Sequence, residues 1–179
     1  LADDKLTRKT VKKYIANLTI GSAGVAFILT NKTNAPNRPQ ILGATNATDS
    51  TANKLCQGNG NTQSLMMETD SSALLKAGIG LAKKNWDKFK ARLDWENDTP
   101  DWCIPHQVTG THEKMLCESL KLNSNKFFNT YEYFGNTGSA AVPLTLLKLQ
   151  ETNLIKTGDH IALLGIGSGL SSIMMGIKW

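Results

Sequence analysis

Hydrophobic and polar positions alternate most regularly between residues 70 and 93, where apolar side chains recur at spacings of three and four residues. This period is that of an amphipathic α-helix with one face against a core. Asp70 and Ser71 stand at its start, where a side-chain oxygen can accept a hydrogen bond from a free backbone N–H. Similar patterns predict further helices over residues 4–16, 109–120 and 139–152.

Short apolar runs lie between the predicted helices and predict strands. One run, residues 25–29, follows a group of small residues and has the composition of a buried strand. Another ends at Pro105, because proline cannot donate to a hydrogen-bonded ladder. The predicted strands cover residues 25–29, 41–45, 102–104, 160–165 and 171–179, and the polar residues 46–64 predict a long surface loop.

The order of these elements alternates strands with helices. Such an order predicts an α/β domain in which helices pack on a mostly parallel sheet, here with the last two strands antiparallel. A length of 179 residues with 40% hydrophobic content fits one globular domain. No apolar run approaches the roughly 20 residues that a membrane-spanning helix needs, so we expect a soluble protein without a membrane span.

The net charge is +5, and two clusters hold much of the basic excess. A basic surface can attract an anionic partner, although a solvated helix face is the simpler interpretation of each cluster. Exposed aromatic side chains do not alternate with these charges as they do on single-strand-binding surfaces, so we expect no nucleic-acid partner. The clusters are Lys5, Arg8, Lys9, Lys12 and Lys13, and Lys83, Lys84, Lys88, Lys90 and Arg92.

Three cysteines, Cys56, Cys103 and Cys117, are an odd number without the spacing of a disulfide framework. This favours a reducing compartment, and we expect a cytoplasmic protein. Two of them form, with His106 and His112, the pattern C-x2-H-x5-H-x4-C. Structural zinc sites use paired short spacings instead, so we expect no metal.

Three segments carry candidate chemistry: residues 104–107 with His106, residues 134–140 with Asn136, and residues 158–169 with several glycines. Taken singly, the histidine fits a buried polar group, the asparagine a turn residue, and the glycines a tight turn. The glycines do not fit a phosphate loop, because such a loop opens a helix inside a longer unit and the chain ends ten residues after Gly169.

Together, in this order and spacing, the three segments resemble the thiolase superfamily, and most closely the C-terminal half of the 3-oxoacyl-acyl-carrier-protein synthase III group. The resemblance implies that residues 1–179 form the C-terminal thiolase-like domain, with a five-stranded mixed sheet and helices packed on it. It also implies an N-terminal half, carrying the nucleophilic cysteine, upstream of Leu1, and a homodimer of the complete enzyme. The helix over residues 139–152 is apolar beyond one stripe, so we expect burial on more than one side.

Members of this group are acyltransferases that join two acyl thioesters by Claisen condensation. By resemblance, His106 and Asn136 would donate hydrogen bonds to the enolate oxygen of one substrate, as preorganised donors at a developing charge. The backbone N–H of Gly169 would belong to the oxyanion hole of the acylated cysteine. The implied substrates are acyl-CoA or acyl-carrier-protein thioesters, and no cofactor is implied.

The chain departs from the group after the His-Gln pair. Group members often carry an asparagine and an arginine there, the arginine helping to dock the carrier protein, whereas this chain has residues 108–112, Val-Thr-Gly-Thr-His. Its ending, residues 165–179, is more similar to the subgroup that condenses two acyl-CoA molecules head to head in olefin formation. Two alternatives are a non-catalytic thiolase-like partner subunit and a small-ligand or lipid-binding domain; the presence of both His106 and Asn136 favours catalysis.

Overall fold

The computed structural model describes residues 7, 11, 15–58 and 67–179. The helix predicted over residues 4–16 lies almost wholly outside these ranges, as does the whole N-terminal basic cluster. The first described element is the short 3-10 helix η1, Ile15–Leu18.

The centre of the molecule is a four-stranded mixed sheet with strand order β1-β6-β5-β4. Only β4 and β5 pair in parallel, because the short turn between β5 and β6 makes that pair antiparallel and β1 adds antiparallel to β6. The expected strand number of five and the mostly parallel direction are therefore wrong, whereas the mixed sheet with helices packed on it and the antiparallel last two strands are confirmed. The strands are β1, Gln40–Thr48; β4, Trp102–Pro105; β5, His160–Gly167; and β6, Ser171–Lys178; a separate antiparallel pair contains β2, Cys56–Gly58, and β3, Met67–Thr69.

The predicted helices over residues 70–93, 109–120 and 139–152 are confirmed to within a few residues. The first begins after Asp70, whose Oδ1 accepts a hydrogen bond from the Ala73 N–H at 3.0 Å. The helices are α2, Ser71–Leu93; α3, Gly110–Leu120; α4, Tyr131–Phe134; and α5, Ala141–Glu151, with 3-10 helices η2, Ser50–Leu55; η3, Ser124–Lys126; and η4, Gly138–Ala140.

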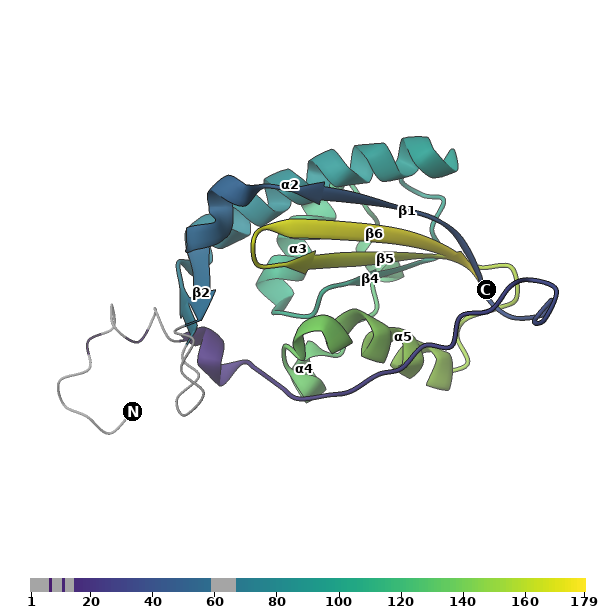
Figure 1. The fold of residues 1–179 in the computed structure, drawn as a ribbon, viewed down its shortest axis with the longest axis horizontal. Helices are drawn as coiled ribbons and strands as arrows, with labels where there is room; N and C mark the ends of the chain where they lie inside the picture. Colours follow the sequence, from purple (N-terminus) through teal and green to yellow (C-terminus); the bar gives the residue numbers. More distant parts are fainter. Residues whose placement is uncertain (1–6, 8–10, 12–14, 59–66) are drawn as a thin grey trace.

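The sheet lies between two helical layers, with α2 and α3 on one face and α4 and α5 on the other (Figure 1). Side chains of β5 alternate between the layers, as the two-residue period of a strand requires. Ala162 packs in the core of Trp86 and Phe89 from α2, whereas its neighbour Ile161 packs against Leu149 from α5. Helices thus pack on both faces of the sheet and hold β4 in place, and the candidate histidine follows directly after this strand.

Another sequence expectation is wrong. Residues 25–29 form no strand; Phe27 is 60% exposed and Ile28 is 96% exposed, because no described strand pairs with this apolar run. The polar stretch 46–64 lies mostly at the surface over its described residues 46–58, but with regular structure, since β1 extends to Thr48 and η2 and β2 follow it. Polar side chains are tolerated there because they fall on outward-facing positions of an edge strand.

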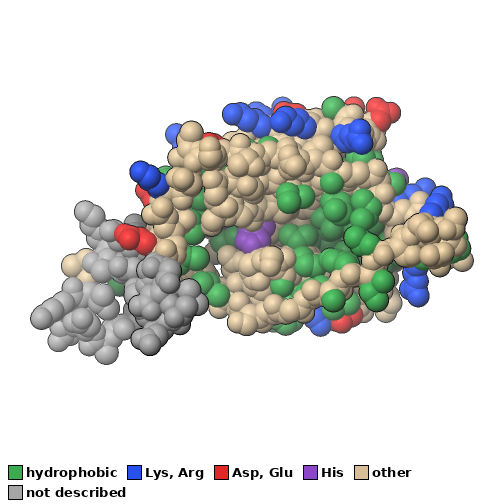
Figure 2. Space-filling view, in the orientation of Figure 1, with side chains coloured by type: hydrophobic (Ala, Val, Ile, Leu, Met, Phe, Trp, Pro, Cys, Tyr) green, Lys and Arg blue, Asp and Glu red, His purple; other side chains and the backbone are tan. Residues whose placement is uncertain are grey.

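None of the described helices is long and apolar enough to cross a membrane. The second basic cluster lies on α2, with four of its five side chains exposed, and Figure 2 shows lysine and arginine side chains along that edge of the molecule. A solvated helix face accounts for this placement.

Candidate active site

A cavity of about 340 Å³ opens between α2, α3 and the turn that joins β5 to β6. Its walls are mostly apolar, and Figure 2 shows a histidine side chain inside a hollow bordered by hydrophobic groups. The apolar wall includes Leu74, Leu75 and Ile79 from α2, Leu116 from α3, and Ile166 and Leu170 from the β5–β6 hairpin. Such a shape suits an aliphatic ligand with a few polar contacts.

His106 follows directly after β4. Its backbone N–H donates to the Leu164 carbonyl at 2.9 Å, which extends the β4–β5 ladder by one step and fixes the position of the ring. Burial, and next the nearby His112, lower the pKa of His106 below the ordinary histidine value. The imidazole is therefore neutral near pH 7, and one of its ring nitrogens carries a hydrogen that can be donated to a ligand.

Asn136 lies between α4 and η4. Its backbone N–H donates to the Thr19 carbonyl at 2.8 Å, and its carbonyl accepts from the Gly21 N–H at 2.9 Å. The preceding Gly135 has φ of +64°, and a Cβ there would lie 2.6 Å from the Thr19 oxygen, so only glycine fits. The Asn136 Oδ1 accepts from the Gly138 N–H at 3.0 Å, which leaves the Nδ2 amide as a donor.

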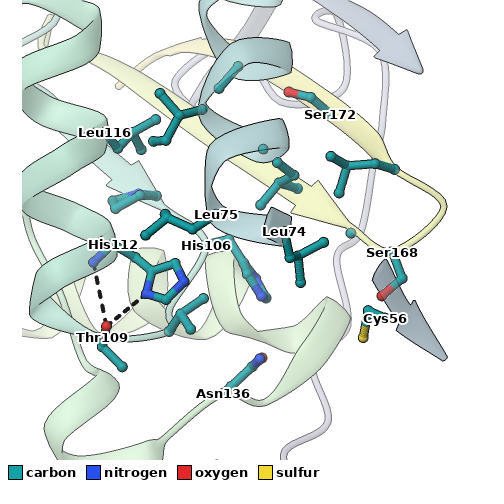
Figure 3. Close-up of a pocket in the computed structure, with 18 of the residues that line it drawn as sticks. Cys56, Leu74, Leu75, His106, Thr109, His112, Leu116, Asn136, Ser168 and Ser172 are labelled. Atoms are coloured by element: carbon teal, nitrogen blue, oxygen red, sulfur yellow. Dashed lines mark hydrogen bonds between the residues drawn. The ribbon is translucent and has the colours of Figure 1, made fainter. Parts of the chain in front are cut away.

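The structure brings His106 and Asn136 into the lining of one cavity. Figure 3 shows the two side chains at the same end of the cavity, approaching it from β4 and from the α4–η4 loop. The arrangement offers two neutral hydrogen-bond donors to the interior of one mostly apolar cavity.

Gly169 lies in the β5–β6 turn with φ of +126°, a conformation that favours glycine. Its neighbours Ser168 and Leu170 line the cavity, whereas Gly169 itself is outside the lining. The turn is held by two hydrogen bonds between the backbones of Leu170 and Asp49, at 2.8 and 2.9 Å. Gly169, the residue expected to contribute to an oxyanion hole, therefore lies at the rim of the cavity.

Gln107 is a fully buried residue whose role the sequence analysis did not consider. Its Nε2 donates to the Pro105 carbonyl at 2.7 Å, and its Oε1 accepts from the backbone N–H groups of Thr130 and Tyr131 at 2.7 and 3.1 Å. The side chain therefore connects the end of β4, with His106, to the start of α4, which leads to Asn136. The sequence signal that could have indicated this role was a glutamine shortly after the end of a predicted strand.

His112 and Glu113 of α3 also line the cavity, although the sequence analysis considered only the first, as a metal ligand. The Glu113 Oε1 accepts from Asn129 Nδ2 at 3.3 Å, and its Oε2 is buried without a hydrogen-bond partner. Burial raises the pKa of this carboxyl group. Thr109 before the predicted helix indicated an N-cap, but the local sequence did not indicate that His112 faces a cavity.

Cys103 and Cys117 are held as neutral thiols. Burial raises the pKa of the Cys103 thiol to about 12, and burial also raises that of Cys117. Cys56 lines the cavity and accepts a hydrogen bond from Thr69 Oγ1 at 3.6 Å. Across residues 15–58 and 67–179, no three His, Cys, Asp or Glu side chains are grouped closely enough to hold a metal ion.

Known proteins resemble this chain in sequence and in fold. The family model described as 3-oxoacyl-[acyl-carrier-protein (ACP)] synthase III C terminal matches residues 91–179. The acyl-CoA:acyl-CoA alkyltransferase of Shewanella oneidensis is 35% identical over 189 residues, which cover 99% of this chain and 54% of that protein. The enzyme of the same name from Xanthomonas campestris pv. campestris is 34% identical, over 97% of this chain and 50% of that protein.

A solved structure of Xanthomonas campestris OleA, a cysteine-to-serine variant with bound lauric acid and lauroyl-CoA, superposes with a TM-score of 0.87. It is 32% identical, and the match covers 99% of this chain and 51% of that one. This chain thus spans about half the length of the relatives that it matches. It belongs to the thiolase-fold condensing enzymes of the 3-oxoacyl-acyl-carrier-protein synthase III type, as a C-terminal domain of that family.

Proposed function

We propose that this chain supplies the His and Asn of a Cys-His-Asn site that joins two acyl thioesters by Claisen condensation. The observation that carries the proposal is the pair of neutral donors, His106 and Asn136, at one end of an apolar cavity. The nucleophilic cysteine would come from an N-terminal thiolase half, because the chain spans about half of its relatives and burial raises the pKa of the Cys103 and Cys117 thiols.

A general base, which we assign to the N-terminal half, accepts an α-proton from one acyl thioester, and negative charge develops on the thioester oxygen as the enolate forms. The His106 ring N–H and the Asn136 Nδ2 amide stabilise that oxygen, and a low-dielectric cavity strengthens both interactions. The enolate carbon then attacks the acyl group on the cysteine, and the thiolate leaves. In that step the backbone N–H of Gly169, at the rim of the cavity, contributes to the oxyanion hole of the acyl-cysteine.

Acyl-CoA is the substrate class that the cavity favours. OleA has been solved with lauric acid and lauroyl-CoA, and the apolar wall of the present cavity suits an aliphatic chain of that kind. Residues 108–112 lack the arginine expected for carrier-protein docking, so an acyl-carrier-protein is the less favoured donor. The acting form is a homodimer in which each subunit combines both halves.

The test uses the polypeptide in which a thiolase-like N-terminal half with its cysteine precedes this chain. His106→Ala or Asn136→Ala should slow condensation by about two to three orders of magnitude, because each removes one oxyanion donor. Acylation of the cysteine should fall much less, since backbone N–H groups serve that step. Trapped radiolabelled acyl-enzyme and condensed product are measured separately.

His160→Ala is the control, because this histidine lies outside the cavity lining. Near-normal condensation in both site variants would rule out their role as enolate stabilisers. Equal losses of acylation and condensation would indicate a structural role. Absence of any acyl transfer in the unaltered protein would support the alternative of a non-catalytic thiolase-like partner subunit.

A further inference from the structure

His112 is held in a defined orientation at the start of α3. Thr109 is the N-cap of this helix, and its Oγ1 accepts a hydrogen bond from the His112 backbone N–H at 3.4 Å. The same hydroxyl lies 2.8 Å from Nδ1 of the His112 ring. One threonine side chain therefore positions both the backbone and the ring of this histidine.

The hydroxyl of Thr109 has a single hydrogen to donate. Its oxygen accepts from the backbone N–H and could accept a second hydrogen bond, but only donation to Nδ1 also uses the hydroxyl hydrogen within this group of contacts. The neutral ring then carries its own hydrogen on Nε2. Figure 3 shows the ring edge opposite the Thr109 contact turned into the cavity, toward His106.

The surroundings favour the neutral ring. Burial lowers the pKa of His112 below its ordinary value. Among the described residues, the other titratable side chains that line the cavity are Cys56 of β2, His106 after β4 and Glu113 of α3. Burial raises the pKa of Glu113, so its negative charge is disfavoured. The lining residues of α2, β5 and β6 carry no titratable group.

We propose that His112 is a third hydrogen-bond donor of the cavity and binds the carbonyl oxygen of the acyl thioester through its Nε2–H. The inference rests on acyl thioesters being the ligands of this site. It assigns Thr109 as a positioning residue, which orients the His112 ring. His112 would thus select ligands with an acyl carbonyl over alkyl ligands of the same length.

The test compares two stable ligands by calorimetry, in the protein that combines this chain with its N-terminal half. One is the dethia analogue of lauroyl-CoA, in which a methylene group replaces sulfur and the carbonyl remains; the other is S-dodecyl-CoA, which lacks that carbonyl. His112→Leu should weaken binding of the carbonyl analogue about tenfold, the value of one neutral hydrogen bond. Binding of S-dodecyl-CoA should not change.

His112→Gln retains an amide donor of similar reach and should restore most of the affinity. His160→Leu, the loss of an imidazole outside the cavity, is the matched control and should bind both ligands normally. Equal weakening of both ligands by His112→Leu, or no weakening of either, would overturn the assignment of His112. If His106→Ala weakens only the carbonyl analogue at the same time, the proposed condensation site survives; if the unaltered protein binds neither ligand, both proposals fail.

A second measurement is independent of the variants. Long-range ¹H–¹⁵N spectra of the unaltered protein should show His112 as the neutral tautomer with its hydrogen on Nε2. Thr109→Val should abolish this preference, and Thr109→Ser should retain it. A hydrogen on Nδ1 in the unaltered protein would contradict the proposal.

Discussion

At the scale of single residues, the candidate site consists of a few polar groups whose orientation is fixed by the backbone. The ladder contact with Leu164 fixes the backbone from which the His106 ring projects, and the Gly138 N–H holds the Asn136 amide. Both side chains line the cavity. Because the surrounding side chains are mostly apolar, the neutral forms of these groups are the stable ones.

The two buried histidines should make stability depend on pH. Burial lowers the pKa values of His106 and His112, so the unfolded chain binds protons at a higher pH than the folded one. As the pH falls through about 6.5, the ordinary value, the free energy of unfolding should therefore decrease, and the loss should level off below the folded pKa values. Urea unfolding between about pH 7.5 and 5 measures this slope.

A double variant, His106→Gln with His112→Gln, removes both titrating rings and should flatten the slope in that window. The comparison matters more than the absolute slope, since other titratable groups, among them Glu113 with its raised pKa, contribute to the slope of both proteins. Identical slopes for the two proteins would contradict the buried, neutral state of the histidines.

The residue types of the site were predictable, but their contacts were not. His106 and Asn136 were found because their neighbouring residues resemble a known family. His112 was missed as a cavity residue because its role depends on the Thr109 hydroxyl and on burial by α2, and neither follows from spacing along the chain. Gln107 was missed because its partners, Thr130 and Tyr131, lie far from it in sequence.

At the scale of elements, hydrogen bonds of the Gln107 side chain link the end of β4 to the start of α4. Replacement by leucine leaves the N–H groups of Thr130 and Tyr131 without their acceptor, at about 1–3 kcal/mol each. We expect Gln107→Leu to lower the free energy of unfolding by about 3 kcal/mol in urea titrations. Gln150→Leu, an exposed position on α5, is the matched control, and equal effects of the two changes would contradict the proposed connection.

The end of α2 packs closely on the sheet where β1 and β6 both carry glycine. Gly176 of β6 is paired with Gly43 of β1, and a Cβ at Gly176 would lie 2.5 Å from Leu93 Cδ1 and 3.0 Å from Trp95. Gly176→Ala should therefore destabilise the fold by about 1–3 kcal/mol. The same change at Gly80, exposed in α2 with nothing within 4 Å, should stabilise it by up to about 1 kcal/mol, and thermal unfolding tests both.

Elements with strong periodicity were predicted well, and those that depend on a partner were not. The period of α2 and its Asp70 cap follow from local sequence. Residues 25–29 had the composition of a buried strand, yet a strand also needs a neighbour to pair with. The parallel direction expected for most of the sheet failed for the same reason, since the pairing of β1 with β6 is set by tertiary structure.

At the scale of the whole molecule, apolar surface remains uncovered on the side of the sheet that carries α5. That helix buries Leu146 and Leu149 against the sheet, whereas Leu147 is 44% exposed and Ile28 in the extended segment is 96% exposed. Burial of α5 on a second side thus stays a prediction. Exposed apolar groups of this kind typically mark an interaction surface, and the proposed N-terminal half is the partner that the length of the relatives suggests.

This partnership can be tested with the two halves produced as separate polypeptides. Leu147→Lys and Ile28→Lys should leave the folding of this chain nearly unchanged, because both side chains are already exposed. Each change should raise the dissociation constant for the N-terminal half at least about tenfold, as expected for a buried apolar contact at an interface. Ala91→Lys, exposed on α2 at the opposite face of the sheet, controls for the added charge. If sedimentation analysis gave the same dissociation constant for all three variants, the exposed face would not be the surface that joins the halves.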